Sequence, residues 1–166
     1  FSPVAYYEPF DDANVVVFTS VQTFNDPHFV KTRQQPSTAE GFRVALEQEA
    51  SAVSNVHVHG QELVGWLATT PGTGMLGSIR YQASVTSSDV SEAPYDITFS
   101  AGFRSGPRLF GSISTWNGHD ACSLRTEDGG TVQSRPMTSI ASTSASASRQ
   151  WCAPLGMMMI GLSGHA

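Results

Sequence analysis

Apolar residues in this chain come in short runs with a period of two, bounded by residues that favour turns. Gly41–Glu49 alternates, with Phe42 on one face and Glu47 on the other, as in a half-buried strand. Glu62–Ala68 is apolar on both faces, so we expect a central strand with Trp66 largely buried and Trp116 less so. Helical periodicity is nearly absent. We predict an all-β sandwich with strands at Val15–Phe24, Gly41–Glu49, Glu62–Ala68, Ile79–Val85, Tyr95–Phe99, Leu109–Trp116, Ala121–Arg125 and Met157–Leu162.

Part of this pattern occurs twice. Phe18–Arg33 aligns without gaps to Phe110–Arg125 at a spacing of 92 residues (110 − 18), and Phe24 matches Trp116 in character. Five of the 16 aligned positions are identical, which favours duplication over a chance match between two strands. We therefore expect two related antiparallel β-sandwich units, residues 1–70 and 95–166, joined by residues 71–94. The identical pairs are Phe18/Phe110, Ser20/Ser112, Thr23/Thr115, Asn25/Asn117 and Arg33/Arg125.

The composition excludes some functions. Of 166 residues, 14% are charged, the net charge is −5, and Lys31 is the only lysine. No basic stripe is available for nucleic acid or for an acidic membrane surface. The 22 Ser and 14 Thr supply the polarity instead, which is typical of a secreted, cell-surface or matrix β-protein. Leu155–Leu162 is too short to span a bilayer, so we expect no membrane insertion.

Two cysteines, Cys122 and Cys152, lie in the second predicted unit. An extracellular setting favours a disulfide between them, and two unrelated buried thiols are the alternative. The Ser/Thr-rich segment 138–148, which lies between them, fits either a mobile loop or a site of O-glycosylation.

Several short motifs resemble H-type lectin domains and their bacterial relatives. They are the strand Val15–Phe24 with the Asn25-Asp26 loop, the T-x-x-G-F sequence Thr38–Phe42, the VGWLA sequence Val64–Ala68, and Ile97–Phe103 at the start of the second copy. The resemblance covers most of residues 4–69 and about half of 95–162. It implies a six-stranded antiparallel β-sandwich per unit, frequent trimers, and binding of N-acetylgalactosamine or galactose at subunit edges.

The same resemblance implies sugar contacts from an acidic loop residue at Asp26, with Asp120 nearby in the second copy, and from an arginine at Arg33 or Arg125. The Trp-His pair of the family falls at Glu49-Ala50 and is absent. The loops also hold aromatic, amide and imidazole groups suited to sugar faces and hydroxyls, although turn formation and core packing explain them equally well. The candidate carbohydrate-binding residues are Asn25, Asp26, His28, Arg33, Trp116, Asn117, His119, Asp120 and Arg125.

Motifs for metal, cofactor and catalysis are weak. His57, His59 and Glu62 provide three possible zinc ligands where a structural site needs four, so we favour a loop held by hydrogen bonds and expect no metal. No G-x-S-x-G, phosphate-binding glycine loop or H-E-x-x-H is present, and we expect no cofactor and no enzymatic activity.

Two functions remain open, beside the weaker possibility of an accessory module of a hydrolase. The first is non-catalytic, extracellular, lectin-like binding or adhesion to glycans or glycoproteins. The second is a structural subunit of a self-assembling extracellular filament or matrix, favoured by the low charge and the Met157–Met159 run. Either function predicts a homo-oligomer or polymer.

Overall fold

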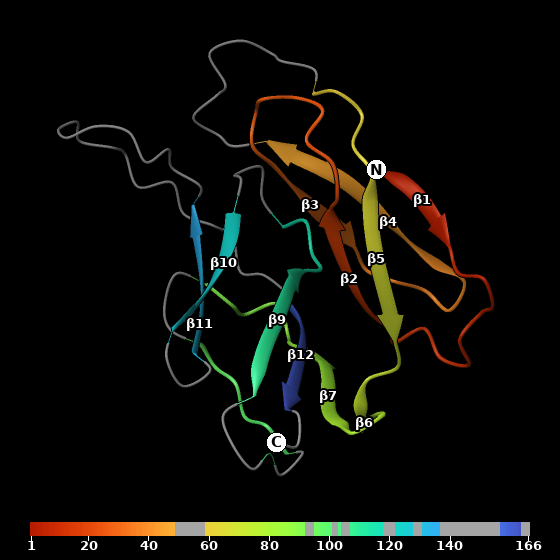
Figure 1. The fold of residues 1–166 in the computed structure, drawn as a ribbon, viewed down its shortest axis with the longest axis vertical. Coiled ribbons are helices and arrows are strands. Elements are labelled where there is room, and N and C mark those ends of the chain that lie inside the picture. Colours follow the sequence, from red (N-terminus) through yellow and green to blue (C-terminus); the bar gives the residue numbers. More distant parts are fainter. Residues whose placement is uncertain are drawn as a thin grey trace, which may run out of the picture.

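A computed structural model describes residues 1–48, 59–91, 95–100, 103, 107–117, 122–127, 131–136 and 157–163, with side chains up to residue 124. These residues form antiparallel strands and no helix, so the predicted all-β class is confirmed (Figure 1). The described strands are β1 Ser2–Ala5, β2 Val16–Val21, β3 Val30–Gln35, β4 Gly41–Gln48, β5 Val64–Thr69, β6 Gly72–Leu76, β7 Ile79–Val85, β8 Tyr95–Asp96, β9 Arg108–Ile113, β10 Cys122–Glu127, β11 Thr131–Pro136 and β12 Met157–Ser163.

All eight strands expected from alternation are present, and β1, β3, β6 and β11 are additional. Strand β3 was hidden from a search for apolar residues because the side chains it buries are Thr32, Arg33 and Gln34. Buried polar groups are tolerated only where they have partners, and a sequence does not display those partners.

The first five strands make two sheets that pack face to face. Strand β4 lies between β1 and β3, and β2 pairs with β5. Val16 and Val17 of β2 share a core with Phe42 and Val44 of β4, and Val64 of β5 packs against it. This arrangement is a small β-sandwich whose centre is formed by β2 and β4.

The same pairing recurs in the last five strands. Strand β11 lies between β10 and β8, and β9 pairs with β12, which also pairs with the hairpin β6–β7. The registers of the two strand pairs also correspond. Val21 of β2 lies opposite Val64 of β5, and Ile113 of β9 lies opposite Met157 of β12. The two positions of the second pair follow those of the first by 92 (113 − 21) and 93 (157 − 64) residues. A duplicated unit would produce this recurrence, and the division into residues 1–70, 71–94 and 95–166 stays our prediction.

The two halves pack against each other through β2. Strand β2 contacts β7, β9 and β12, and Ala83 of β7 belongs to the same core as the valines of β2. A second, smaller core in the later strands includes Val90, Ile113 and Cys122.

Our expectation for Trp66 was wrong. Its side chain is 45% exposed, against 38% for Trp116, which reverses the predicted order. Among the described strands β5 bonds only to β2, so it is an edge strand rather than a central one. Trp66 packs against Tyr6 and Phe42 on one side, whereas Trp116 is covered by residues far away in sequence.

The alternation in β4 also breaks at its end. We expected Glu47 to face away from the core, yet Glu47 is 6% exposed. Basic side chains from β3 surround its carboxylate, and this ion pairing compensates for the burial of its charge.

Candidate functional site

The turn after β2 gathers three of the predicted site residues, Asn25, Asp26 and His28. Asp26 is only 9% exposed. Its carboxylate accepts hydrogen bonds from the backbone N–H groups of His28 (3.0 Å) and Gly60 (3.2 Å), and its Oδ1 lies 2.6 Å from Nδ1 of His28. The Asn25 side-chain amide donates to the Gln61 carbonyl over 2.8 Å. These groups therefore tie the turn to the segment that enters β5.

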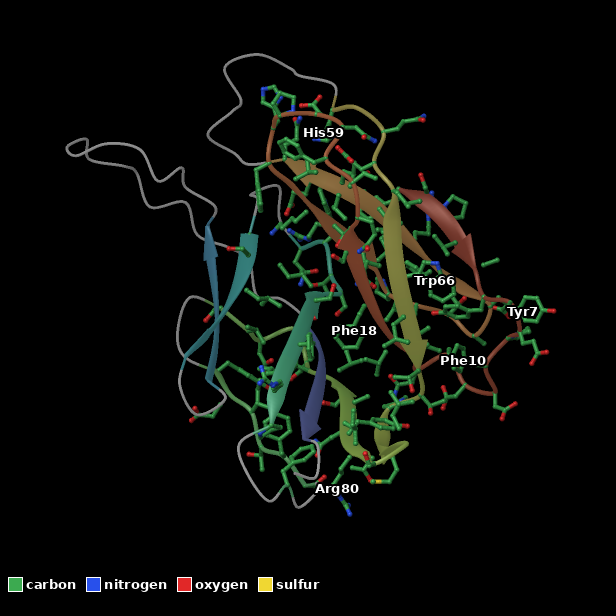
Figure 2. The ribbon with its side chains drawn as sticks, in the orientation of Figure 1. Tyr7, Phe10, Phe18, His59, Trp66 and Arg80 are labelled. Carbon is green, nitrogen blue, oxygen red and sulfur yellow. The ribbon has the colours of Figure 1, made fainter. Side chains whose placement is uncertain are left out.

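His59 also contacts this turn, and it lies at the end of the molecule opposite Arg80 (Figure 2). Its Nδ1 lies 2.7 Å from the Gly60 carbonyl and its Nε2 lies 3.1 Å from the His28 carbonyl. Both nitrogens can donate to carbonyls only when the ring is protonated. Burial opposes the charge, but these two hydrogen bonds, together with Asp26 and Glu62, raise the pKa of His59.

Glu62 completes this cluster. The Thr23 hydroxyl and the Asn25 backbone N–H donate to its carboxylate. The Thr23 hydrogen bond is the main reason why the pKa of Glu62 is lowered, and the charge of His59 contributes. In the described residues no group of three His, Cys, Asp or Glu side chains is arranged to hold a metal ion. His57 lies outside the described residues.

Arg33 occupies a different environment, because it is 1% exposed. Its Nη1 donates to Oε1 of Glu47 over 2.8 Å, and Oε2 of the same carboxylate lies 3.0 Å from Nζ of Lys31. Burial lowers the pKa of Lys31 more than the negative charge of Glu47 raises it. The Arg33 guanidinium is thus enclosed by the protein, so we assign it a structural part and leave it out of the ligand site.

The same arginine connects the two halves of the chain. Its Nη2 donates to the Thr115 carbonyl over 2.9 Å, and its guanidinium carbon lies 4.8 Å from the centre of the Trp116 ring. The Phe1 ring also packs against the Trp116 ring, with the ring planes nearly perpendicular (84°) and the centres 5.2 Å apart. Next to it, the fully buried Gln34 donates to the Ser112 hydroxyl over 2.7 Å. Two predicted site residues, Arg33 and Trp116, are therefore brought together at an internal contact.

The remaining predicted residues are only partly described. Asn117 is exposed and follows Trp116, and Arg125 lies in β10, where the side chain is not described. His119, Asp120, Cys152 and the segment 138–148 lie outside the described residues. Cys122 is 2% exposed and is not a free thiol; its pairing with Cys152 stays a prediction.

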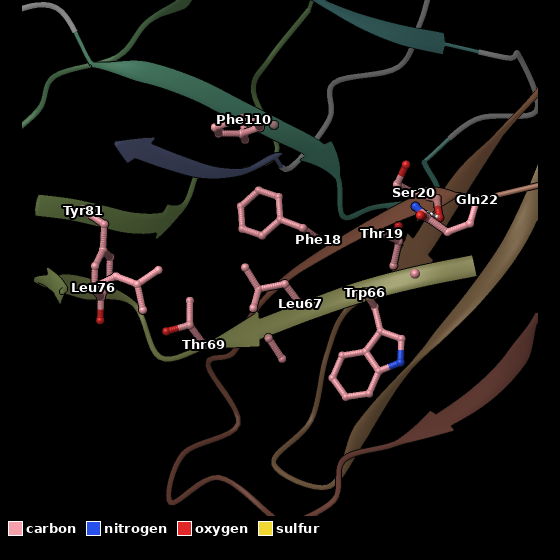
Figure 3. A pocket seen from close by; sticks show the side chains of 13 residues that line it. Phe18, Thr19, Ser20, Gln22, Trp66, Leu67, Thr69, Leu76, Tyr81 and Phe110 are labelled. Carbon is pink, nitrogen blue, oxygen red and sulfur yellow. Dashed lines mark hydrogen bonds between the residues drawn. The ribbon is translucent and has the colours of Figure 1, made fainter. Parts of the chain in front are cut away.

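A groove of about 730 Å³ runs along the junction of the two halves. Phe18, Leu67, Leu76 and Phe110 approach it from four strands (Figure 3). Leu67, Leu76 and Phe110 are 57%, 68% and 52% exposed. The lining residues that the structure describes carry no charge and are Phe18, Thr19, Ser20, Gln22, Gly65, Trp66, Leu67, Ala68, Thr69, Leu76, Tyr81, Phe110 and Gly111.

The pattern of apolar residues did not lead us to predict this groove, although two features of the sequence indicate it. The segment that contains β5 is apolar on both faces, and one of those faces lines the groove rather than a core. Phe18 and Phe110 are identical positions of the repeat, and both line the groove.

The described part of the chain is thus an all-β protein of antiparallel sheets with an uncharged apolar groove at their junction. A stretch of 113 residues, 68% of the chain, is 29% identical to a protein named halomucin from Haloquadratum walsbyi (strain DSM 16790 / HBSQ001), and it spans 1% of that protein's length. No family model and no solved structure matches the chain. No described helix is long and apolar enough to cross a membrane. The resemblance to H-type lectins stays an expectation.

Proposed function

We propose that the chain is a non-catalytic structural module of an extracellular protein that associates with a second copy of itself through the groove. The observation that carries this proposal is the exposure of Leu67, Leu76 and Phe110 along one uncharged surface. The hydroxyl-rich, low-charge composition and the similarity to the protein named halomucin support the extracellular assignment.

The chemistry of the groove favours a protein partner over a sugar. Sugar hydroxyls are best held by planar groups that make two hydrogen bonds, such as carboxylates, amides and guanidinium groups. Among the described residues of the lining, Gln22 is the only such side chain, and the large side chains are mostly leucine and aromatic. Covering the exposed part of each large apolar side chain contributes about 1 kcal/mol to association.

A second copy is the occupant because related strands already meet at this junction. Phe18 of β2 and Phe110 of β9 occupy the same position in the repeat and line the groove from its two sides. The groove therefore continues a contact that one half of the chain makes with the other. A second copy carries the same apolar strands and can extend that contact.

Sedimentation equilibrium tests this proposal with a matched pair of variants in β6. Leu76 and Met75 are adjacent and 68% and 50% exposed, but only Leu76 lines the groove. We expect wild type and Met75→Ser to associate equally and Leu76→Ser to associate about tenfold more weakly. A monomeric wild type at millimolar concentration contradicts the proposal.

Glycan binding is the second candidate, favoured by two aromatic side chains that flank the turn after β2. Phe24 and Phe29 are 78% and 62% exposed, with the Asn25 amide between them in sequence. Phe24→Ala should abolish retention on a glycan array, because it deletes a ring that can stack on a sugar face. Retention that is unchanged in Asp26→Ala combined with Asp120→Ala would exclude the carboxylates named from the sequence.

A further inference from the structure

We propose that two copies associate by pairing β5 of one copy antiparallel to β5 of the other, which joins their two β2–β5 sheets into one continuous sheet. This inference rests on the self-association proposed above and specifies the strand through which it occurs. It concerns the same site, because the residues from Gly65 to Thr69 of β5 all line the groove. Both copies use the same surface, so the contact closes as a dimer.

The backbone of β5 has hydrogen-bonding groups that point away from β2. The Gln22 N–H donates to the Leu63 carbonyl over 2.8 Å, which makes these two residues a hydrogen-bonded pair of the ladder. Such pairs alternate along antiparallel strands, so every second residue of β5 directs its N–H and C=O groups outward. The residues that face β2 are Gly65, Leu67 and Thr69, and those that face outward are Val64, Trp66 and Ala68.

The two edges of the β2–β5 sheet differ in how these groups are satisfied. At the edge formed by β2, the Gln34 side chain donates to the Val17 carbonyl over 3.1 Å, and the Thr32 hydroxyl donates to the Thr19 carbonyl over 3.2 Å. At the edge formed by β5, no strand and no backbone hydrogen bond of the described residues reaches the outward groups. The edge of β5 is therefore the one that can accept a further strand.

Strand β5 also lacks the features that keep sheet edges from pairing with another chain. Edge strands are commonly protected by short length, by proline or by charged side chains. The edge strand β1 has four residues and contains Pro3, and the edge strand β3 carries Lys31 and Arg33. Strand β5 has six residues, none of which is charged or a proline.

The sequence of β5 has the pattern of a strand covered on both faces. Leu67 and Trp66 are consecutive, so their side chains point to the two faces of the strand. In a single copy they remain 57% and 45% exposed. Pairing with a second copy gives β5 a neighbour at each edge, which turns it into the central strand that its apolar residues predict.

A pairing centred on Trp66 fits this strand. It places Val64 opposite Ala68 of the second copy and Trp66 opposite its own equivalent, so all three outward-facing residues of β5 have partners. On the groove face, Leu67 then lies opposite Gly65 of the second copy. Because glycine has no side chain, this position leaves room for the leucine.

The same register brings an apolar side chain to the groove. Leu63 directly precedes β5 and is 65% exposed. It lies two positions before Gly65, so it falls on the groove face and opposite Thr69 of the second copy. Thr69 and Leu76 lie at the same end of the groove (Figure 3). Leu63 of each copy is thus placed to cover Leu76 of the other.

Disulfide cross-linking of mixed variants tests this register. Opposite residues in a pair of this kind have Cα atoms about 4.5 Å apart, within reach of a disulfide, whereas diagonal neighbours are roughly 7–8 Å apart and beyond it. Gly65→Cys mixed with Leu67→Cys at millimolar concentration should therefore give a linked heterodimer on oxidation. Each variant alone should give little linked dimer. A mixture that links no better than the separate variants overturns the pairing.

A proline substitution tests the backbone contact by sedimentation equilibrium. Ala68→Pro removes an outward N–H that β2 does not use, so the sheet should tolerate it while association weakens about tenfold. Ala68→Ser is the matched control, because it keeps the N–H and should associate like wild type. Urea melts of both variants show whether a loss of association reflects a loss of folding.

The outcomes separate this inference from the proposed function. If Leu76→Ser weakens association while Ala68→Pro associates like wild type and the cysteine mixture gives no excess of heterodimer, the strand pairing is wrong and the groove proposal stands. A monomeric wild type at millimolar concentration overturns both.

Discussion

The turns that follow β2 and β9 occupy the same place in the repeat but have opposite environments. Trp116 lies under the Arg33 guanidinium and against Phe1, and it links the two halves. Phe24 projects into solvent, while Asp26 and His28 behind it hold the turn to its own half. The two turns thus have equivalent positions in the repeat. Whether each turn has a structural role or is available for binding depends on which residues of the chain pack against it.

The largest effect should come from the charge that covers the Trp116 turn. Arg33→Ala leaves the buried Glu47 carboxylate without its best partner, so we expect a loss of about 3–5 kcal/mol in unfolding free energy. Urea denaturation measures it. Arg43→Ala is the control, because Arg43 is exposed and should change stability by less than about 0.5 kcal/mol. A small loss at Arg33 would contradict its structural role.

A second large effect concerns the close approach of β1 and β4. Gly41 lies opposite Ala5, and a Cβ at Gly41 would overlap the Val4 carbonyl oxygen. Gly41→Ala should therefore destabilise by about 1–3 kcal/mol through overpacking. Gly60→Ala should change stability less, because the nearest atom to its Cβ would be 3.6 Å away. Equal losses in thermal melts would contradict the packing described for β1.

The two aromatic turns themselves should respond unequally. Trp116→Ala removes the ring beneath Arg33 and should lower the unfolding free energy by about 1–3 kcal/mol, less than for a fully buried tryptophan. Phe24→Ala should stay within about 0.5 kcal/mol of wild type in a monomeric sample. If the two substitutions have the same effect in denaturant, the contrast between the turns is wrong.

The smallest effect is pH dependence at the Phe24 turn. The pKa of His59 is raised above its ordinary value of 6.5, so its contribution to stability is complete below pH 6.5 and is lost as the pH rises through the raised pKa. The pKa of Glu62 is lowered from 4.5, so its contribution is present above pH 4.5 and is lost as the pH falls through the lowered pKa. The two groups together therefore stabilise the turn most between pH 4.5 and pH 6.5.

Melting temperatures at about pH 5.5 and about pH 8.5 check this dependence. The wild type should lose more stability than His59→Gln as the pH increases between these two values, because a glutamine side chain has no charge to lose. An identical pH response in both proteins would show that His59 is not protonated in the fold.

The sequence predicts the strands of this protein better than its contacts. Alternation finds eight strands because half-buried strands repeat every two residues, and the duplication predicts the turns after β2 and β9. Alternation fails at β3, where Arg33 and Gln34 are buried with partners from β4 and β9. It also misplaces Trp66, since apolar residues on both faces of a segment look the same in a central strand and in an edge strand beside a groove.

Methyl NMR spectroscopy of the wild-type chain at increasing concentration tests the central claim most directly. The methyl resonances of Leu67 and Leu76 should shift or broaden as the protein is concentrated, because a second copy covers the groove. The methyl resonance of Met75, which neighbours Leu76 but does not line the groove, should stay constant. Resonances of Leu67 and Leu76 that do not change up to millimolar concentration would contradict the account.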